Sequence, residues 1–196
     1  MRYSGAKGIA RVCTRLPSDF VEQVVESVLD LLTVNVTSST LPADVMKPSA
    51  QTHALDPAHL AALDALDLYA VSESTWHGAF LAVAELARRT LLPPPLLRRT
   101  VYWVLRGLTL ELRWGLSTVG ASVRDAACYV MWALPRTRDV TLLRPSALYA
   151  AQRLVVVMTL DREVTVRRAA SAAFQEWVGR TVGGAASLLW QARLTL

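Results

Sequence analysis

An apolar pattern recurs three times along the chain, in WHGAFLAVAELA (residues 76–87), VRDAACYVMWAL (residues 123–134) and VRRAASAAFQEW (residues 166–177). In each stretch apolar residues occupy the first, fourth, fifth, eighth and ninth positions, which is the spacing of one face of an α-helix. The second stretch begins 47 residues after the first, and the third begins 43 residues after the second. These periods lie in or near the range of about 40 to 47 residues found in HEAT and armadillo repeats. Residues 1–5 begin a fourth copy.

Small residues occupy the early positions of each copy and larger ones the later positions, so neighbouring helices can approach closely and still fill the space between them. One helix pair cannot bury such a face alone, and stacked copies can. We therefore predict an all-α fold, an α-solenoid of three to four HEAT- or armadillo-type helix pairs. A globular helical bundle with accidental internal similarity is the alternative.

Helical periodicity extends over most of the chain. Pro17 and Ser18 mark one helix start, and residues 93–95, three prolines, mark a helix end. No alternating strand pattern with a hairpin signal is found, so we expect no strands. The helices are expected over residues 1–16, 18–32, 73–92, 96–113, 122–134, 145–160 and 165–180.

The chain divides into four parts on this basis. Residues 1–32 and 73–180 carry the HEAT-like helices. Residues 33–72 are rich in Ser, Thr and Pro in their first half, so we expect an exposed loop or disordered insertion with a short helix between 57 and 71. Residues 181–196 form a tail that does not continue the pattern.

Composition excludes several classes of protein. Hydrophobic residues make up 53% of the chain, yet charged residues interrupt every candidate for the roughly 18 to 20 apolar residues of a membrane span, so no membrane partner is expected. The net charge of +5 is dispersed along helices, which argues against nucleic acid as the partner. Cys13 and Cys128 lie far apart in apolar segments and are interpreted as reduced core thiols.

No residue pattern indicates catalysis or a cofactor. His53 and His59 have no Cys, Asp or Glu at the spacing of a zinc site. Nucleotide-binding glycine loops and nucleophile motifs are missing from the sequence. We expect no catalytic residue, no metal and no cofactor. The six tryptophans are expected in the core.

The candidate residues for partner contact or for contacts between repeats are His77, Arg124, Arg167, Arg168 and Arg180. His77 follows Trp76 at a helix start, where a partner contact and a buried hydrogen bond are both open.

Arg124 and Arg167 occupy the same position of the repeat, and Arg2 is their equivalent in the first copy. We favour half-buried arginines, each paired with a carboxylate in the preceding turn, with Asp161 as the partner of Arg167 or Arg168. A basic ladder facing a partner protein is the alternative.

Four blocks, residues 2–17, 76–89, 117–133 and 161–180, resemble the tubulin-folding cofactor D (tubulin-specific chaperone D) family. The segment 34–72 is longer than the family pattern, Pro135 interrupts an apolar helix of the family, and the chain after Arg180 departs from it. We expect the chain to correspond to an internal stretch of a longer array.

The resemblance implies a non-catalytic HEAT-repeat scaffold that binds β-tubulin. It further implies that the protein assembles the αβ-tubulin heterodimer together with cofactors C and E and an Arf-like small GTPase. It also implies that the protein contributes, with these cofactors, to activation of GTP hydrolysis by tubulin. The implied location is the cytoplasm and the microtubule cytoskeleton. A generic HEAT adaptor, of the transport-receptor or phosphatase-scaffold type, is the alternative.

Overall fold

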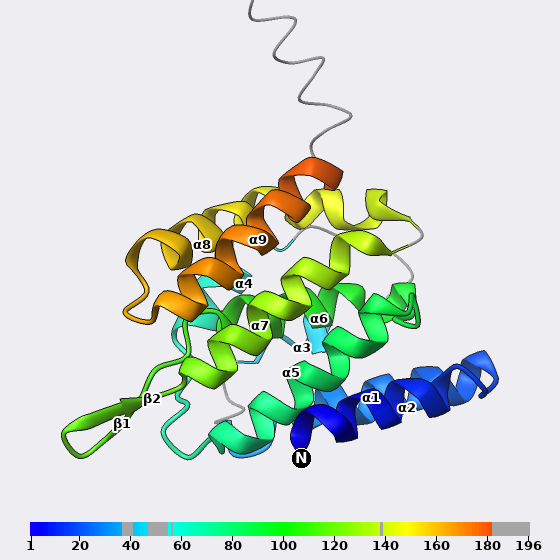
Figure 1. Ribbon diagram of the computed structural model, residues 1–196, viewed down its shortest axis with the longest axis horizontal. Helices are drawn as coiled ribbons and strands as arrows, with labels where there is room; N and C mark the ends of the chain where they lie inside the picture. The colour runs from blue at the N-terminus through cyan, green and yellow to red at the C-terminus, as the bar shows by residue number, and fades with distance from the viewer. Residues whose placement is uncertain (37–40, 47–54, 56, 138, 182–196) are drawn as a thin grey trace, which may run out of the picture.

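The computed structural model describes residues 1–36, 41–46, 55, 57–137 and 139–181, which form helices and one small hairpin (Figure 1). The α-helices are α1 (Arg2–Cys13), α2 (Ser18–Asp30), α3 (Ala43–Met46), α4 (Pro57–Asp64), α5 (Glu73–Arg88), α6 (Leu97–Gly107), α7 (Ala121–Ala133), α8 (Ala147–Leu160) and α9 (Val164–Thr181). The 3-10 helices are η2 (Pro94–Leu96), η3 (Leu134–Arg136) and η4 (Val140–Ser146). The strands are β1 (Leu112–Trp114) and β2 (Ser117–Val119).

Two layers of helices make up the body of the molecule. Helices α1, α5, α7 and α9 lie side by side in one layer, which we call the front layer (Figure 1). Behind it, α2 packs against α5, α6 against α7 and α8 against α9. The all-α prediction is confirmed, and the ordered stack of α1, α5, α7 and α9 is the arrangement expected of an armadillo- or HEAT-type solenoid.

Aromatic residues fill the centre between the layers. Trp76 of α5 contacts Phe80 and Trp103 edge-to-face, with ring centroids 5.8 Å apart in both pairs, and Tyr102 lies 5.6 Å from Trp103. A Cβ atom on Gly107 would lie 2.4 Å from the Phe80 ring, so only glycine fits where α6 meets α5. At this point α5 and α6 pack so closely that one additional carbon atom would clash.

The tryptophans differ in how deeply they are buried. Trp76, Trp103 and Trp177 are fully buried as predicted, whereas Trp132 is only half-buried. The side chain of Trp114 lies outside the described part of the structure, as do Trp190, His53 and the tail 182–196. Cys13 and Cys128 are buried free thiols.

A hairpin corrects the expectation of no strands. Strands β1 and β2 pair antiparallel, with Leu112 opposite Val119 and Trp114 opposite Ser117. Gly115 opens the two-residue turn with a φ of 59°, a conformation that glycine adopts without strain. Helix α6 consequently ends at Gly107 instead of near residue 113. Three-residue strands are too short to leave an alternating pattern in the sequence.

The segment 33–72 also differs from its prediction as an exposed loop. Its described part includes α3 and α4, the latter within the range where a short helix was expected. The apolar side chains that it buries in the core are Val36, Val45, Leu55, Leu63, Leu66, Leu68 and Val71. These residues are scattered among polar ones without a helical period, which is why periodicity alone did not detect them.

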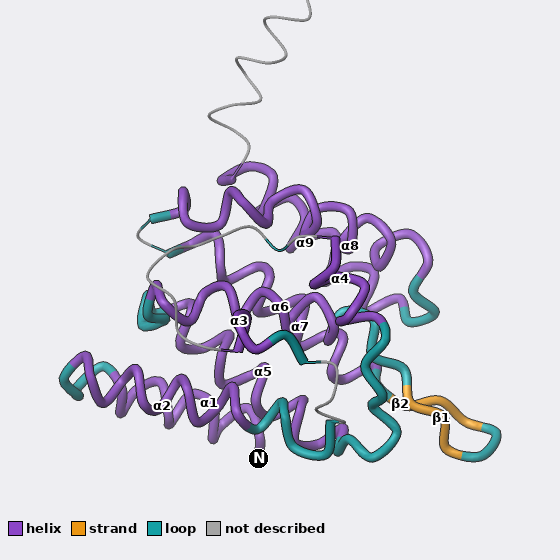
Figure 2. Tube along the Cα trace, turned by 180° about the vertical axis from the view of Figure 1, so that it is seen from behind, coloured by secondary structure: helices purple, strands orange, loops and turns teal. Residues whose placement is uncertain are grey.

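This segment lies on the side away from the front layer. Figure 2 shows α3 and α4 from behind, where both pack against α6. An ion pair of 2.5 Å joins Asp64 of α4 to Arg153 of α8. The chain thus covers part of its own back layer. Among the described helices, none combines the length and the apolar character that crossing a membrane requires.

Candidate functional site

Each helix of the front layer carries a row of side chains that are partly or fully exposed, except for Leu81 and Glu85, which are buried. The members of a row are spaced three or four residues apart, so they share one side of their helix. The rows are Tyr3, Lys7 and Arg11 on α1; His77, Leu81, Glu85 and Arg88 on α5; Asp125, Tyr129 and Trp132 on α7, with Arg136 in η3; and Arg168, Ala172, Glu176 and Arg180 on α9.

Two adjoining hollows form a groove across these rows, which we call the front groove. Its first part lies over α1, α5 and α7 and is lined by Arg2, Tyr3, His77, Leu81, Asp125 and Tyr129, together with Met1. Its second part lies over α7 and α9 and is lined by Cys128, Trp132, Ala169 and Ala172. Asp125 and Tyr129 line both parts, so the two hollows adjoin at α7 and together reach from the start of α1 to the first half of α9.

A buried carboxylate, Glu85 of α5, is bonded to Tyr129, which lines the groove. The Glu85 side chain has no exposed surface, and it accepts a hydrogen bond of 3.1 Å from Arg88 Nη2 and another from Arg89. The Tyr129 hydroxyl donates to Glu85 Oε1 at 2.8 Å, which joins α7 to α5. Burial by itself would raise the pKa of Glu85, but the bonds from Arg89, Tyr129 and Arg88 outweigh it and lower the pKa to about 2.

Two aromatic rings on the front layer carry cations over their faces. Lys7 Nζ lies 4.4 Å from the centre of the Tyr3 ring, and the Arg136 guanidinium lies 3.7 Å from the Trp132 ring. Such stacking is favourable because the ring face is electronegative. Arg136 also pairs with Glu176 of α9 at 3.1 Å. The front layer therefore combines apolar surface with fixed positive charge.

His77 and Asp125 face each other across the groove from α5 and α7. Burial lowers the pKa of His77 and the charge of Arg2 lowers it further, and the opposing charges of Glu73 and Asp125 do not make up for this. Burial raises the pKa of Asp125, while His77 opposes this. Within the described residues, His77 Nδ1 has no hydrogen-bond partner. The prediction left a partner contact and a buried hydrogen bond open for His77, and the second is not made at this nitrogen.

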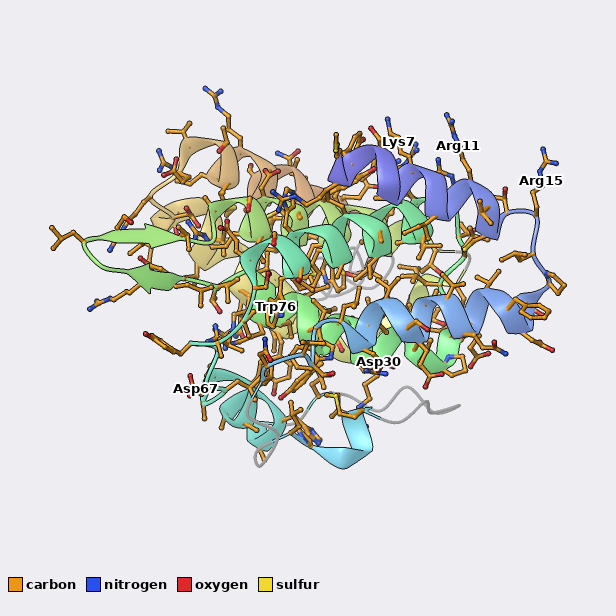
Figure 3. All side chains as sticks on the ribbon, turned by 90° about the horizontal axis from the view of Figure 1, so that it is seen from below. Lys7, Arg11, Arg15, Asp30, Asp67 and Trp76 are labelled. Carbon is orange, nitrogen blue, oxygen red and sulfur yellow. The ribbon has the colours of Figure 1, made fainter. Side chains whose placement is uncertain are left out.

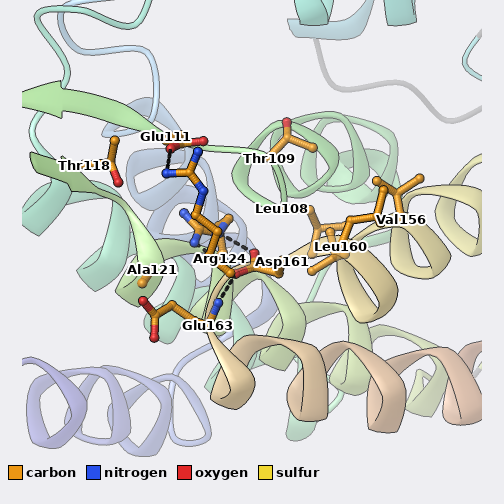
Figure 4. A pocket seen from close by; sticks show the side chains of 12 residues that line it. Leu108, Thr109, Glu111, Thr118, Ala121, Arg124, Val156, Leu160, Asp161 and Glu163 are labelled. Atoms are coloured by element: carbon orange, nitrogen blue, oxygen red, sulfur yellow. Dashed lines mark hydrogen bonds and ion pairs between the residues drawn. The ribbon is translucent and has the colours of Figure 1, made fainter.

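Arg124 joins α7 to the loop before α9 (Figure 4). Its Nε donates to Asp161 Oδ2 at 2.6 Å and its Nη2 to Asp161 Oδ1 at 3.1 Å, a two-point contact that fixes the guanidinium plane. Its Nη1 donates to the Leu110 carbonyl at 2.9 Å. Burial alone would raise the pKa of Asp161, but Arg124 and the Glu163 N–H lower it overall.

This pairing corrects the predicted one. Asp161 was expected to pair with Arg167 or Arg168, yet its carboxylate binds the arginine of the preceding repeat. Arg167 instead donates from Nη1 to the backbone carbonyls of Asp161 at 2.6 Å and Arg162 at 3.1 Å. The sequence pattern could not distinguish the two because a carboxylate between two repeats lies within reach of arginines from both.

The five predicted residues fall into two groups. His77, Arg168 and Arg180 lie in the rows of the front layer, and Arg180 pairs with Glu176 there. Arg124 and Arg167 are near the starts of their helices and bind loops of the chain itself.

Sequence reasoning missed Glu85, Lys7, Tyr129 and Trp132 of the front layer. A signal existed for Glu85, which is followed by arginines three and four residues later. Within the described residues, no group of three or more His, Cys, Asp or Glu side chains is arranged to hold a metal ion.

Comparison with known proteins supplies the family. A family model described as "Tubulin-specific chaperone D-like, ARM repeats" matches residues 1–42 and 61–185. The chain belongs to this family. The unmatched residues 43–60 fall within the segment that includes α3 and the start of α4.

Two curated relatives carry the same family description in their names. The tubulin-specific chaperone D of Dictyostelium discoideum is 39% identical over 183 residues, and the tubulin-folding cofactor D of Schizosaccharomyces pombe is 29% identical over 180 residues. These alignments cover 93% and 92% of the chain but only 10% and 14% of the relatives, so the chain spans a small part of their length. No solved structure matches the chain.

Removing the Arg124 side chain should destabilise this ARM-repeat stack. Arg124→Ala leaves the Asp161 carboxylate, whose side chain is 5% exposed, without its cation, and we expect a loss of about 3 to 5 kcal/mol in the free energy of unfolding. Urea unfolding followed by circular dichroism measures it. Arg168→Ala is the control, because Arg168 is exposed and should change stability by less than about 0.5 kcal/mol. Equal losses in the two variants would contradict the assigned role of Arg124.

The Glu85 cluster predicts a pH dependence of stability. Because the folded-state pKa is about 2 and the unfolded value is 4.5, the ionised carboxylate stabilises the fold above pH 4.5, and this contribution is lost as pH falls toward 2. Glu85→Gln removes the charge at every pH. Wild type should therefore be more stable than Glu85→Gln at pH 7, and the difference should shrink between pH 4.5 and 2. A difference that stays constant over this range would refute the prediction.

Proposed function

We propose that the chain is a non-catalytic scaffold segment that binds β-tubulin during post-chaperonin folding and assembly of the αβ-tubulin heterodimer. Membership of the tubulin-specific chaperone D-like family supports this proposal most strongly. The names of the two relatives refer to a tubulin-specific chaperone and a tubulin-folding cofactor. Both relatives are far longer than this chain, so the activity assigned here is a share of what a longer array does.

The geometry suits a scaffold. A stack of helices joined by the Glu85 cluster and the Arg124–Asp161 pair holds its surface side chains in fixed positions, so little conformational freedom is lost on binding. The front layer offers a groove with no covering element among the described residues, and the back layer is partly covered by α3 and α4. In this role the chain stabilises a folding client by contact.

The partners of the family complete the proposal. We assign cofactors C and E and an Arf-like small GTPase as companions, with a contribution to GTPase activation of tubulin only in their presence. The cytoplasm and the microtubule cytoskeleton are the proposed location. Within the chain, residues 1–32 and 73–180 are proposed as the repeat units, with 33–72 as an insertion between them and 181–196 as a separate tail.

The positive net charge of the chain supports an acidic protein as its client. The chain has a net charge of +5, with 21 basic and 16 acidic residues. Complementary charge raises the rate of encounter between two proteins and weakens as salt screens it. Tubulin is an acidic protein, so the electrostatic attraction has the sign that association requires.

Binding of purified αβ-tubulin to the purified chain tests the proposal. We expect a complex whose dissociation constant rises as sodium chloride increases from 50 to 300 mM, measured by biolayer interferometry. An acidic protein of similar net charge, such as serum albumin, serves as the control and should bind at least tenfold more weakly. Failure to bind tubulin, or equal binding of the control protein, would refute the proposal.

A further inference from the structure

The two layers of the solenoid differ in what remains open to a partner. On the back, α3 and α4 pack against α6, and Asp64 of α4 pairs with Arg153 of α8 (Figure 2). On the front, the groove runs over α1, α5, α7 and α9 without a covering element among the described residues (Figure 1). A partner therefore has continuous access to the front layer.

Positive charge extends the front groove along α1. Lys7, Arg11 and Arg15 follow one another at intervals of four residues, and Figure 3 shows all three pointing away from the body on the side of the front layer. Helix α1 contains no acidic residue to compensate them. The row begins at Tyr3, which lines the groove, so the charge and the groove form one surface.

The acidic groups of the front layer are mostly neutralised within the molecule. Glu85 is buried under Arg88 and Arg89, and Glu176 pairs with both Arg136 and Arg180. Among the described residues, two carboxylates of the layer stay outside such ion pairs: Asp125 is exposed and lines the groove with His77, and Glu73 of α5 accepts a hydrogen bond from Ser122 of α7. The groove lining therefore holds one cation, Arg2, and one carboxylate, Asp125, and the excess positive charge of this face comes from the α1 row that starts at Tyr3 (Figure 3).

Aromatic surface lies beside this charge. Tyr3 is 46% exposed, Tyr129 and Trp132 are half-buried, and all three line the groove. Lys7 over Tyr3 places a cation next to an apolar contact area, and Arg136 lies over Trp132 while it pairs with Glu176. A ligand that matches this surface has carboxylates adjacent to an aromatic or aliphatic side chain.

We propose that the front groove binds an acidic segment of the tubulin client, with an aromatic or aliphatic side chain seated against Tyr129 and Trp132 and carboxylates facing Lys7 and Arg11. This inference rests on the proposed function and adds the face and the chemistry of contact. Asp125 repels such a segment, so it limits affinity and favours a client whose acidic residues avoid that point.

Charge reversal on exposed residues tests the proposal without disturbing the core. Arg11→Glu on α1 and Arg113→Glu on β1 make the same change in net charge, and both side chains are exposed. We expect Arg11→Glu to weaken tubulin binding about fivefold to tenfold, and Arg113→Glu to stay within about twofold, because Arg11 continues the basic row that starts at Tyr3 in the groove (Figure 3), whereas Arg113 lies on the hairpin. Asp125→Asn should strengthen binding, and Tyr3→Ala should weaken it.

The outcomes separate the inference from the function. Tubulin binding by wild type with equal effects of Arg11→Glu and Arg113→Glu would overturn the front groove and leave the proposed function standing. No tubulin binding by wild type would overturn both. Sedimentation of the chain alone is the second readout: self-association that Arg11→Glu abolishes would mean that a second copy occupies the groove, which also overturns the proposal. Circular dichroism verifies that each variant is folded.

Discussion

Helix α5 is surrounded by other parts of the chain, and the rest of the structure depends on this burial. Every residue from Ala79 to Ala87 is buried, with α1 on one side and α7 on the other. A carboxylate inside such a helix would be unstable alone, and Glu85 is held by Arg88, Arg89 and the hydroxyl of Tyr129. The same contacts that satisfy Glu85 set the spacing of α5 and α7, and so the floor of the front groove.

The character of the front surface follows from this arrangement. The carboxylates Glu85 and Glu176 are paired with arginines within the layer, while Lys7 and Arg11 on α1 project to solvent beside the exposed ring of Tyr3 (Figure 3). Segments α3 and α4 cover part of the back layer, whereas the front groove has no covering element among the described residues, which is why we propose the front as the partner face. For the proposed scaffold role, a rigid complementary surface is sufficient, since such a surface can stabilise one conformation of a bound protein over others.

The sequence predicted the parts of the fold that repeat. The copies that begin at residues 76, 123 and 166 correspond to α5, α7 and α9, which stack in the front layer. They also placed Trp76 and Trp177 in the core, because burial on one face produces a helical period. Features without a period were missed: the hairpin at Gly115, the buried apolar residues of segment 33–72, and the Arg124–Asp161 pair, which spans two repeats. In the candidate site, His77, Arg168 and Arg180 lie in helices that the sequence predicted. The groove could not be predicted, because it depends on how the four helices α1, α5, α7 and α9 are spaced.

Hydrogen–deuterium exchange of the chain with and without αβ-tubulin tests most directly whether the front layer is the interacting face. The account predicts added protection in peptides from α1 and from the Asp125–Trp132 part of α7, with no change in α4, α6 or the β1–β2 hairpin. Protection confined to α4 and α6, or to the hairpin, while α1 and α7 exchange as in the free chain, would contradict it.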